Sequence, residues 1–305
     1  MTRATSRTRT RRSVLAALLV GATAALGIPA ATSQAAPAVA GSVPAATRIT
    51  TLPSTCSAEV AMVRPDRSMA LAHVQGTRAS LEPIGVTLAY MPKTLAYAGS
   101  SASRGLTIDR YFAIDSAGAL RLITVFDRPA NTPRVTHTDT VVGTSWAGIR
   151  TVVSSGPYLY GITTTGALKR YAVSNTYAVR GAGTLATAGW GGVRQLAFGG
   201  WWNAGGDRRV EDIVGLARNG SVAAYMIPRQ SPFRITTHRL ATGGWGMFSG
   251  LVMGSCSTST GRTVLGIKPN GDVHAYYDVN GNDQSWRDLR IGPRVATGWT
   301  GLIGG

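Results

Sequence analysis

The sequence predicts an all-β protein, a five-bladed β-propeller built from four-stranded antiparallel blades. Three observations predict this fold. Short β-branched runs alternate with glycine-rich turns, and windows of helical periodicity are few. A hairpin phrase returns five times at a period close to that of one propeller blade. The chain also ends on a strand that its first repeat lacks, so the ring can be closed by the C-terminal strand joining the first blade.

The repeated phrase is clearest at residues 159–171, LYGITTTGALKRY, where two alternating strands flank a tight turn at Gly166. Two further copies occupy 213–225 and 264–276, and looser copies occupy 111–123 and 61–72. In chain order the turn residues are Arg67, Gly118, Gly166, Gly220 and Gly271, and successive gaps between them are 51, 48, 54 and 51 residues. A period this regular indicates one structural unit per repeat.

Each repeat is preceded by a short apolar strand that begins at a tryptophan. The four tryptophans are Trp146, Trp190, Trp245 and Trp299, and the phrases TLATAGW, RLATGGW and RVATGW lead into three of them. In the second repeat Leu95-Ala-Tyr-Ala-Gly takes this place without a tryptophan. One blade is therefore expected to contain an inner strand, a two-strand hairpin and an outer strand. Residues 299–305 are an inner strand with no hairpin after them, and we expect them to complete the first blade.

The chain before the repeats has a different character. Residues 1–35 combine five arginines, an apolar stretch and a small-residue cleavage site, which is typical of a cleaved signal peptide. Arg11 and Arg12 leave both the Sec and the twin-arginine export routes open. Residues 36–55 are rich in Ala, Pro, Ser and Thr and are expected to be a linker, followed by the propeller at 56–305. The protein is expected to be secreted, with no membrane span.

Charge and cysteine content fit an exported protein. Without residues 1–35 the chain keeps 26 basic and 14 acidic residues, a net charge of +12, and almost all of the basic residues are arginines. Arginine suits carboxylate, phosphate and sulfate groups, although scattered arginines can also serve solubility alone. Cys56 and Cys256 fall in equivalent loops of neighbouring blades in a closed ring, and an even pair in an exported chain predicts a disulfide. Two buried free thiols are the alternative.

The tryptophan lead-ins, the glycine hairpins and the five repeats resemble the tachylectin family of β-propeller lectins. The best local match is GGWGMFSGLVMG at 243–254 followed by VLGIKPNGDVHAYY. The resemblance implies binding of N-acetylated amino sugars in pockets between adjacent blades. This chain departs from a strict repeat, because the second repeat lacks the tryptophan and the first hairpin has Arg67 in the glycine position. We therefore expect one or two working pockets at most.

Two sets of aromatic residues are candidates for ligand binding. The first set is the four lead-in tryptophans, Trp146, Trp190, Trp245 and Trp299, with the hairpin tyrosines Tyr171, Tyr225 and Tyr276. These residues either stack on sugars or fill the gaps between blades. The second set lies in an expected loop of the fourth repeat and consists of Trp201, Trp202, Asn203, Asp207 and Arg208. Two adjacent aromatics beside amide, carboxylate and guanidinium groups have the chemistry of a sugar site, and a self-packed loop is the alternative.

Little in the sequence points to catalysis or to a cofactor. The four histidines are isolated, the sequence contains neither a nucleophile elbow nor a phosphate-binding loop, and a glycan hydrolase would need two carboxylates that only folding could bring together. Residues 278–283 alternate oxygen ligands as calcium loops do, but Asn280-Gly281 is by itself a hairpin turn. We expect no metal and no cofactor.

The sequence as a whole predicts a secreted, monomeric, lectin-like propeller. Its expected partners are glycans or cell-wall polymers, and nucleic acid is not an expected partner. A scaffold that binds a protein or an anionic wall polymer through its arginines is the alternative function, and a propeller hydrolase is the third possibility.

Overall fold

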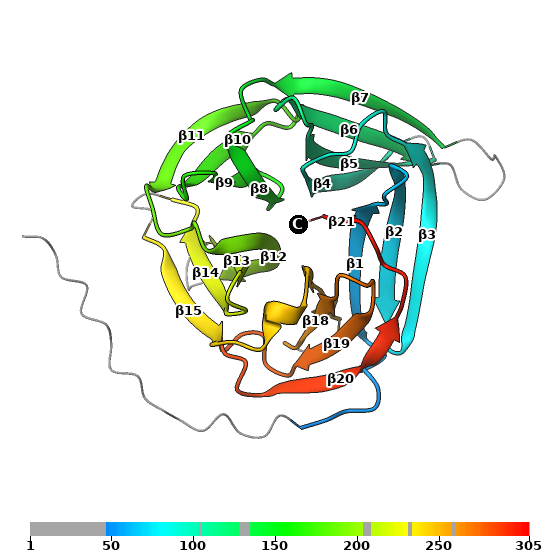
Figure 1. Cartoon of the computed structure of the whole chain (residues 1–305), viewed down its shortest axis with the longest axis vertical. Helices are drawn as coiled ribbons and strands as arrows, with labels where there is room; N and C mark the ends of the chain where they lie inside the picture. Colours follow the sequence, from blue (N-terminus) through cyan, green and yellow to red (C-terminus); the bar gives the residue numbers. More distant parts are fainter. Residues whose placement is uncertain are drawn as a thin grey trace, which may run out of the picture. The chain divides into compact units, whose positions relative to one another are not determined.

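The structure is a computed structural model, and it describes residues 47–103, 105–127, 135–203, 209–230, 234–257 and 260–304. Five antiparallel sheets form the blades of a ring around a central axis (Figure 1). The predicted all-β, five-bladed propeller is confirmed. The predicted signal peptide, residues 1–35, lies outside the described residues. Within the described part of the chain, no helix is long and apolar enough to cross a membrane.

Blades 2, 3 and 4 each contain four consecutive strands, ordered from the axis outwards. Blade 2 contains β4 (Thr94–Ser103), β5 (Leu106–Ile114), β6 (Leu120–Asp127) and β7 (Thr136–Gly143). Blade 3 contains β8 (Ile149–Ser154), β9 (Tyr158–Thr163), β10 (Leu168–Val173) and β11 (Val179–Ala186). Blade 4 contains β12 (Val193–Asn203), β13 (Arg209–Ala217), β14 (Val222–Pro228) and β15 (Thr236–Ala241).

Blades 5 and 1 meet where the ring closes. Blade 5 follows a 3-10 turn, η1 (Trp245–Met247), and contains β16 (Gly250–Met253), β18 (Arg262–Ile267), β19 (Val273–Asp278) and β20 (Leu289–Ala296). Blade 1 contains β1 (Cys56–Val63), β2 (Ser68–Gln75) and β3 (Arg78–Thr87). Two short strands, β17 (Ser255–Cys256) and β21 (Leu302–Ile303), pair with the inner edge of β1.

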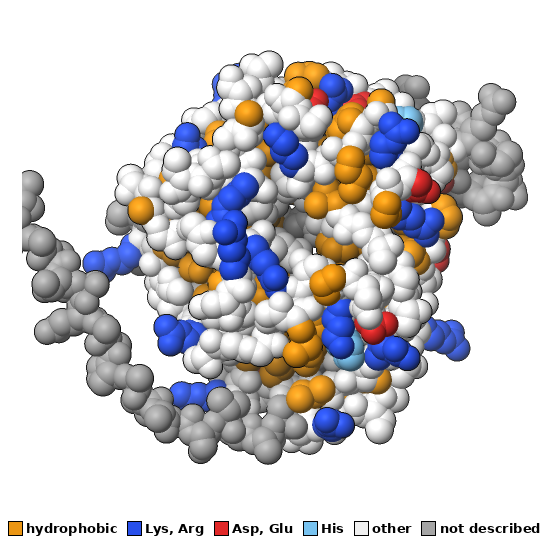
Figure 2. All heavy atoms as spheres, viewed as in Figure 1, with side chains coloured by type: hydrophobic (Ala, Val, Ile, Leu, Met, Phe, Trp, Pro, Cys, Tyr) orange, Lys and Arg blue, Asp and Glu red, His pale blue; other side chains and the backbone are white. Residues whose placement is uncertain are grey.

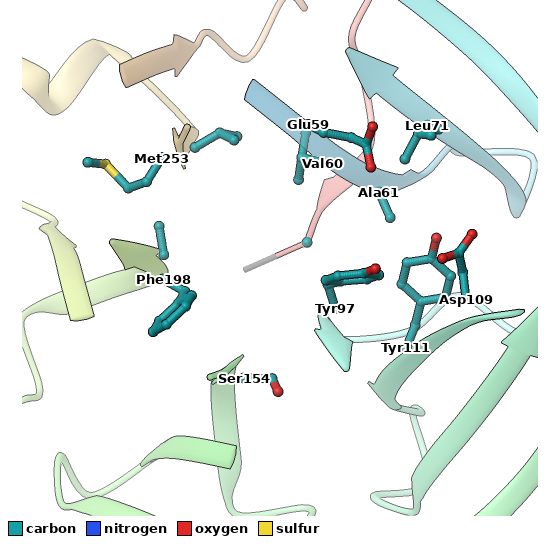
Figure 3. Close-up of a pocket in the computed structure, with 13 residues that line it drawn as sticks. Glu59, Val60, Ala61, Leu71, Tyr97, Asp109, Tyr111, Ser154, Phe198 and Met253 are labelled. Carbon is teal, nitrogen blue, oxygen red and sulfur yellow. The ribbon is translucent and has the colours of Figure 1, made fainter. Parts of the chain in front are cut away.

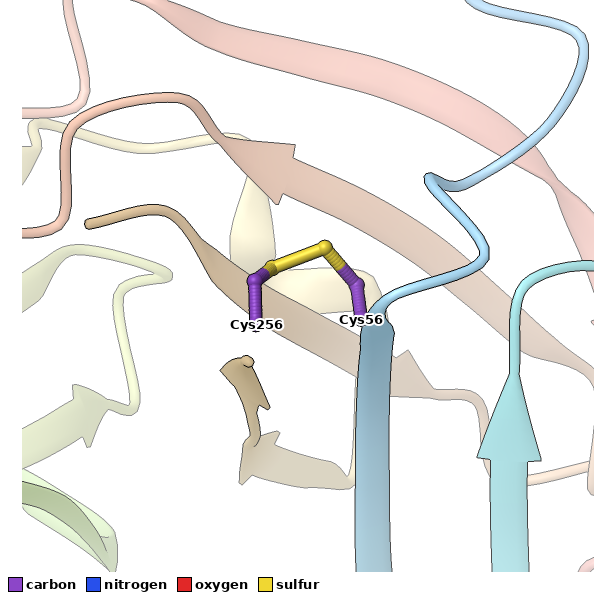
Figure 4. Close-up of a disulfide and its surroundings, with 2 residues drawn as sticks. All are labelled: Cys56 and Cys256. Carbon is purple, nitrogen blue, oxygen red and sulfur yellow. A yellow bond between two sulfur atoms is a disulfide. The ribbon is translucent and has the colours of Figure 1, made fainter. Parts of the chain in front are cut away.

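The C-terminal strand closes the ring, as the sequence predicts. Met62 and Val63 of β1 pair with Ile303 and Leu302 of β21, and the backbone N–H of Gly304 donates to the carbonyl of Ala61 at 2.9 Å. The other end of β1 pairs with β17, where Cys56 and Cys256 form the predicted disulfide (Figure 4). The inner strand of blade 1 is thus supplied in two pieces. Both pieces come from late in the chain, so β1 has no open inner edge at these positions.

The repeated glycines and tryptophans lock neighbouring blades together. The hairpin glycines have left-handed backbone angles, with φ between 79° and 85° at Gly118, Gly166, Gly220 and Gly271. The carbonyl of each accepts a hydrogen bond from the backbone N–H of the tryptophan that opens the next blade: Trp146, Trp190, Trp245 and Trp299, at 2.8 to 3.2 Å. In blade 1 the turn residue is Arg67, also left-handed at φ 70°, and Leu88 makes the equivalent bond at 3.0 Å. Leu88 therefore takes the tryptophan's place in this contact.

The last residues of the predicted 36–55 linker pack against the propeller. The N–H of Ile49 donates to the carbonyl of Ile291 in β20 at 2.8 Å, and Arg48 forms a parallel bridge with the same residue. Leu52 is buried in the cluster of apolar side chains that blades 5 and 1 share. Residues 47–52 therefore lie against the ring before β1 begins.

The disulfide joins residues 200 positions apart, so its removal should destabilise the protein strongly. Chain-entropy arguments give about 5 kcal/mol as an upper figure for a loop of this length. We expect Cys56→Ala/Cys256→Ala to lower the free energy of unfolding by about 2–5 kcal/mol, as measured by urea denaturation. An unchanged unfolding midpoint would show that the pairing of β1 with β21 is enough to close the ring.

Candidate ligand-binding site between blades 3 and 4

The lead-in tryptophans and hairpin tyrosines form the packing between blades. The ring centroids lie 4.3 Å apart in Trp146–Tyr171, 4.1 Å in Trp190–Tyr225 and 4.6 Å in Trp245–Tyr276. All four tryptophans are buried, and Trp299 belongs to the cluster between blades 5 and 1. Burial also raises the pKa of Tyr171, Tyr225 and Tyr276. The structure therefore shows the packing contacts that the sequence predicts as one role of these residues, and ligand contact by the partly buried tyrosines stays a prediction.

The second candidate set lies on a strand, not in the loop that the sequence predicts. β12 extends to Asn203, and Trp201 pairs with Glu211 while Trp202 pairs with Val210 on β13. Successive side chains of a strand point to opposite faces of its sheet. Trp201 therefore faces blade 3 and Trp202 faces blade 5, so the two rings cannot share one ligand. Asp207 and Arg208 lie outside the described residues.

Trp201 joins a group of residues at the junction of blades 3 and 4. The guanidinium carbon of Arg229 lies 4.9 Å from the Trp201 ring centroid and 5.8 Å from that of Tyr158 on β9. A second guanidinium, that of Arg170, lies 4.4 Å from the Tyr158 ring. A pocket of about 340 Å³ opens here, lined by Tyr158, Arg209, Arg229 and Gln230. Trp201 is 43% exposed, and its ring is connected to this pocket through the Arg229 guanidinium.

A buried carboxyl group lies behind this pocket. Glu211 is fully buried, and it accepts hydrogen bonds from the hydroxyls of Ser155, at 3.1 Å, and Tyr160. Burial raises the pKa of Glu211 to about 7, although the Ser155 hydrogen bond and the charge of Arg229, whose Nε lies 3.8 Å from Oε1, act in the opposite direction. Glu211 positions Arg229 from behind the pocket.

The arrangement suits binding of a polyol. An exposed indole face can stack on the C–H face of a sugar ring. Arg229 supplies a fork of N–H donors, and Gln230 offers both a donor and an acceptor. Sequence reasoning found Trp201 but did not single out Tyr158, Arg229 or Glu211 as ligand-site residues. The available signal is the adjacent pair Glu211 and Asp212, two carboxylates near the start of a largely apolar strand.

Trp202 lines a separate pocket on the blade 5 side. That pocket has a volume of about 200 Å³, and Val210, Met226, His238 and Gln284 line it with Trp202. Its walls are mainly apolar side chains of blade 4. Trp202 therefore provides a nearby aromatic residue outside the Trp201 pocket.

The calcium-like segment folds as a turn beside a buried ion-pair network. Carboxylate oxygens of Asp278, Asp283 and Asp288 lie within 4.8 Å of one another. Asp278 is already paired, because Arg262 donates to its Oδ2 at 2.9 Å and to Oδ2 of Asp212 on blade 4 at 2.7 Å. Burial raises the pKa of Asp278 to about 7 despite the charge of Arg262. Arg262 therefore pairs with both buried aspartates and connects blades 4 and 5 through these ion pairs.

Two carboxylates also line a cavity on the central axis, which bears on the hydrolase alternative. They belong to Glu59 on β1 and Asp109 on β5, so both belong to the wall formed by blades 1 and 2 (Figure 3). Glycoside hydrolysis needs carboxyl groups on either side of the scissile bond. The hydrolase alternative therefore stays a prediction.

Comparison with known proteins adds little beyond the fold. No protein-family model and no curated protein matches the sequence. Among solved structures, the chain is similar to AofleA from Arthrobotrys oligospora, at 10% sequence identity, with 74% of this chain and 85% of that chain covered and a TM-score of 0.39. A likeness this slight carries no argument about the site.

The buried Glu211 should make stability depend on pH. Because its folded pKa of about 7 exceeds the usual value of 4.5, the folded state binds more protons between these pH values. The contribution of Glu211 to stability is therefore fully present below its unfolded pKa of 4.5 and is lost as pH rises through about 7. For Glu211→Gln we expect the loss of unfolding free energy between pH 5 and pH 8 to shrink by about 2 kcal/mol. The exposed Glu82→Gln should leave the profile unchanged, and an unchanged profile in Glu211→Gln would contradict the assignment.

Proposed function

We propose that this protein is a secreted carbohydrate-binding propeller whose sugar site is the pocket between blades 3 and 4. The observation that carries the proposal is the exposed ring of Trp201, which lies beside Arg229, a residue that also lines the pocket with Tyr158. The resemblance to tachylectin-type lectins supports an N-acetylated sugar or a cell-surface glycan as the ligand. The disulfide between Cys56 and Cys256 supports an oxidising, extracellular location.

The chemistry of the pocket supports binding rather than bond cleavage. Its ligand-facing groups are aromatic rings, guanidinium groups and an amide, and its carboxyl group is buried behind them. Such groups stack on a sugar and donate hydrogen bonds to its hydroxyl, acetamido or carboxylate oxygens. Binding therefore requires neither a metal nor a cofactor.

The repeat supports one such site. Glu211 lies nine residues before the turn residue of its hairpin, and the residues at this position in blades 1, 2, 3 and 5 are Ala58, Asp109, Pro157 and Arg262. Tyr158 lies eight residues before its own turn, where the other blades have Glu59, Arg110, Asp212 and Thr263. Because the combination of an aromatic residue and a glutamate occurs at one junction, the pocket is not repeated around the ring.

A glycan array at physiological salt tests the proposal, with two tryptophan variants as a matched pair. Trp201→Ala should lose about tenfold or more in affinity for the glycans that the unmodified protein binds. Stacking of a ligand ring on one aromatic side chain is worth about 1–3 kcal/mol. Trp202→Ala removes the same side chain from the other face of the same strand and should retain binding. Equal loss in both variants, or no signal from the unmodified protein above a denatured control, would contradict the proposal.

An anionic wall polymer is the second candidate ligand, and a separate observation favours it. Basic side chains gather beside the channel over blades 3 and 4 on the face in Figure 2. Arg150 on β8 and Arg218 in the β13–β14 turn lie close together, since burial first and then the charge of Arg218 lower the pKa of Arg150. Such charge clusters attract acidic polymers.

Salt dependence separates the two ligands. Binding through exposed arginines should weaken steeply between about 50 and 500 mM salt, because exposed charges are screened over about 10 Å at 0.1 M ionic strength. Sugar stacking on Trp201 should change little over the same range. Binding of a teichoic-type polymer that withstands high salt would contradict the electrostatic candidate.

A further inference from the structure

A cavity of about 270 Å³ lies on the axis of the ring, apart from the Trp201 pocket (Figure 3). Each of the five blades contributes residues to its wall from a strand near the axis: β1, β4, β8, β12 and β16. Much of the wall is apolar and includes Val60, Phe198, Val252 and Met253. The volume is slightly below the roughly 300 Å³ at which pockets for drug-sized ligands begin, so a ligand here would be small.

The wall formed by blades 1 and 2 is chemically different. It carries the carboxylates of Glu59 and Asp109 together with two aromatic rings, those of Tyr97 on β4 and Tyr111 on β5. The two ring centroids lie 5.6 Å apart, and Tyr97 is 44% exposed. Phe198 lies across the cavity from Tyr97 (Figure 3). Aromatic faces and carboxylates around one space favour a positively charged occupant.

The negative charge of this wall is poorly compensated. Among the described residues Asp109 forms no ion pair, and the one partner of Glu59 is His73, whose Nδ1 lies 3.7 Å from Glu59 Oε2 where both side chains are well exposed. Burial, and then the charge of Asp109, raise the pKa of Tyr111. Two uncompensated carboxylates are notable in a chain with 31 basic and 14 acidic residues.

At three of the four other junctions an arginine lies at or beside these repeat positions, whereas the junction of blades 5 and 1 has Thr263 and Ala58. Between blades 4 and 5 the two positions are Asp212 and Arg262, and they form an ion pair at 2.7 Å. Between blades 2 and 3 the guanidinium of Arg110 lies 4.7 Å from the Tyr177 ring. Between blades 3 and 4 Arg229 lies beside Tyr158 and Glu211.

At the junction of blades 1 and 2, the same two repeat positions hold Glu59 and Asp109, so two carboxylates stand where the junctions of blades 2 and 3 and of blades 4 and 5 have a guanidinium. A hard metal ion is a poor candidate for this space, because calcium takes six to eight oxygen ligands and this wall is largely aromatic and aliphatic. An organic cation can contact both the carboxylates and the apolar side chains of this wall.

We propose that the axial cavity binds a small organic cation, an ammonium or guanidinium compound. Its charged group lies between Glu59, Asp109 and the Tyr97 ring, and its apolar part contacts Phe198 and Met253. The cation takes the place that an arginine side chain, Arg110 or Arg262, has at two of the other junctions. This site does not depend on sugar binding at Trp201, so either proposal can fail alone.

Isothermal titration of the purified protein with two cations and a neutral isostere tests the proposal. The cations are choline and butylguanidinium, and the isostere is 3,3-dimethyl-1-butanol, which has the shape of choline without its charge. We expect at least one cation to bind about tenfold or more tightly than the alcohol. Tyr97→Phe should retain that preference because it keeps the ring, whereas Tyr97→Leu should reduce it.

A charge-matched pair of double variants completes the test. Glu59→Gln/Asp109→Asn should abolish the preference for the cation, while Glu82→Gln/Asp127→Asn removes the same two charges from exposed strand positions and should keep it. Thermal unfolding of each variant checks that it folds. Equal affinity for cation and alcohol, no binding of either cation, or equal loss in both double variants would overturn the proposal.

Discussion

Pairing along the inner edge of β1 is the constraint on which the ring depends. Blade 1 begins without an inner strand, so β1 would expose unpaired N–H and C=O groups to the channel. Two short strands from the last fifth of the chain cover this edge, β21 at one end and β17 at the other. Hydrogen bonds hold one end, and the Cys56–Cys256 disulfide holds the other. The entropic cost of closing a loop rises only slowly with loop length, so closing the ring between two distant parts of the chain costs little more than closing a short loop.

Residue type and loop length are more constrained at one end of the central channel than at the other. At one mouth each left-handed turn glycine accepts a hydrogen bond from the next tryptophan, so the residues there are set by backbone geometry. At the other mouth the connection between the first two strands of a blade ranges from two residues after β4, 104–105, to the eight residues 254–261 of blade 5, which include β17. Side chains near this second mouth carry the pockets. A rigid scaffold with variable loops at one end is a common basis for binding sites.

The sequence predicts the ring well because its period, turn glycines and cysteines are local signals with a single geometric solution. It does not predict the site. Trp201 and Trp202 look like a pair until β12 is known to continue past register shifts at 193–195 and 198–200 as far as Asn203, because adjacent residues of a strand point to opposite faces. Tyr158, Arg229 and Glu211 come from two blades and lie up to 71 positions apart. They become neighbours once the strands of adjacent blades are aligned on their turn residues.

That alignment also limits how the protein can bind. The five junctions have different residue pairs at the positions eight and nine residues before the turn. These pairs are two carboxylates, an arginine with a proline, a tyrosine with a glutamate, an aspartate with an arginine, and a threonine with an alanine. A ring of identical pockets gains avidity because several sites engage one surface at once. A ring with one pocket of each kind cannot, so its affinity for a free sugar must come from a single set of contacts. A polymer that repeats one sugar would raise the chance of rebinding, and a basic surface beside the channel would hold an acidic one nearby. Under the proposed function, the architecture therefore favours polymeric ligands over free monosaccharides.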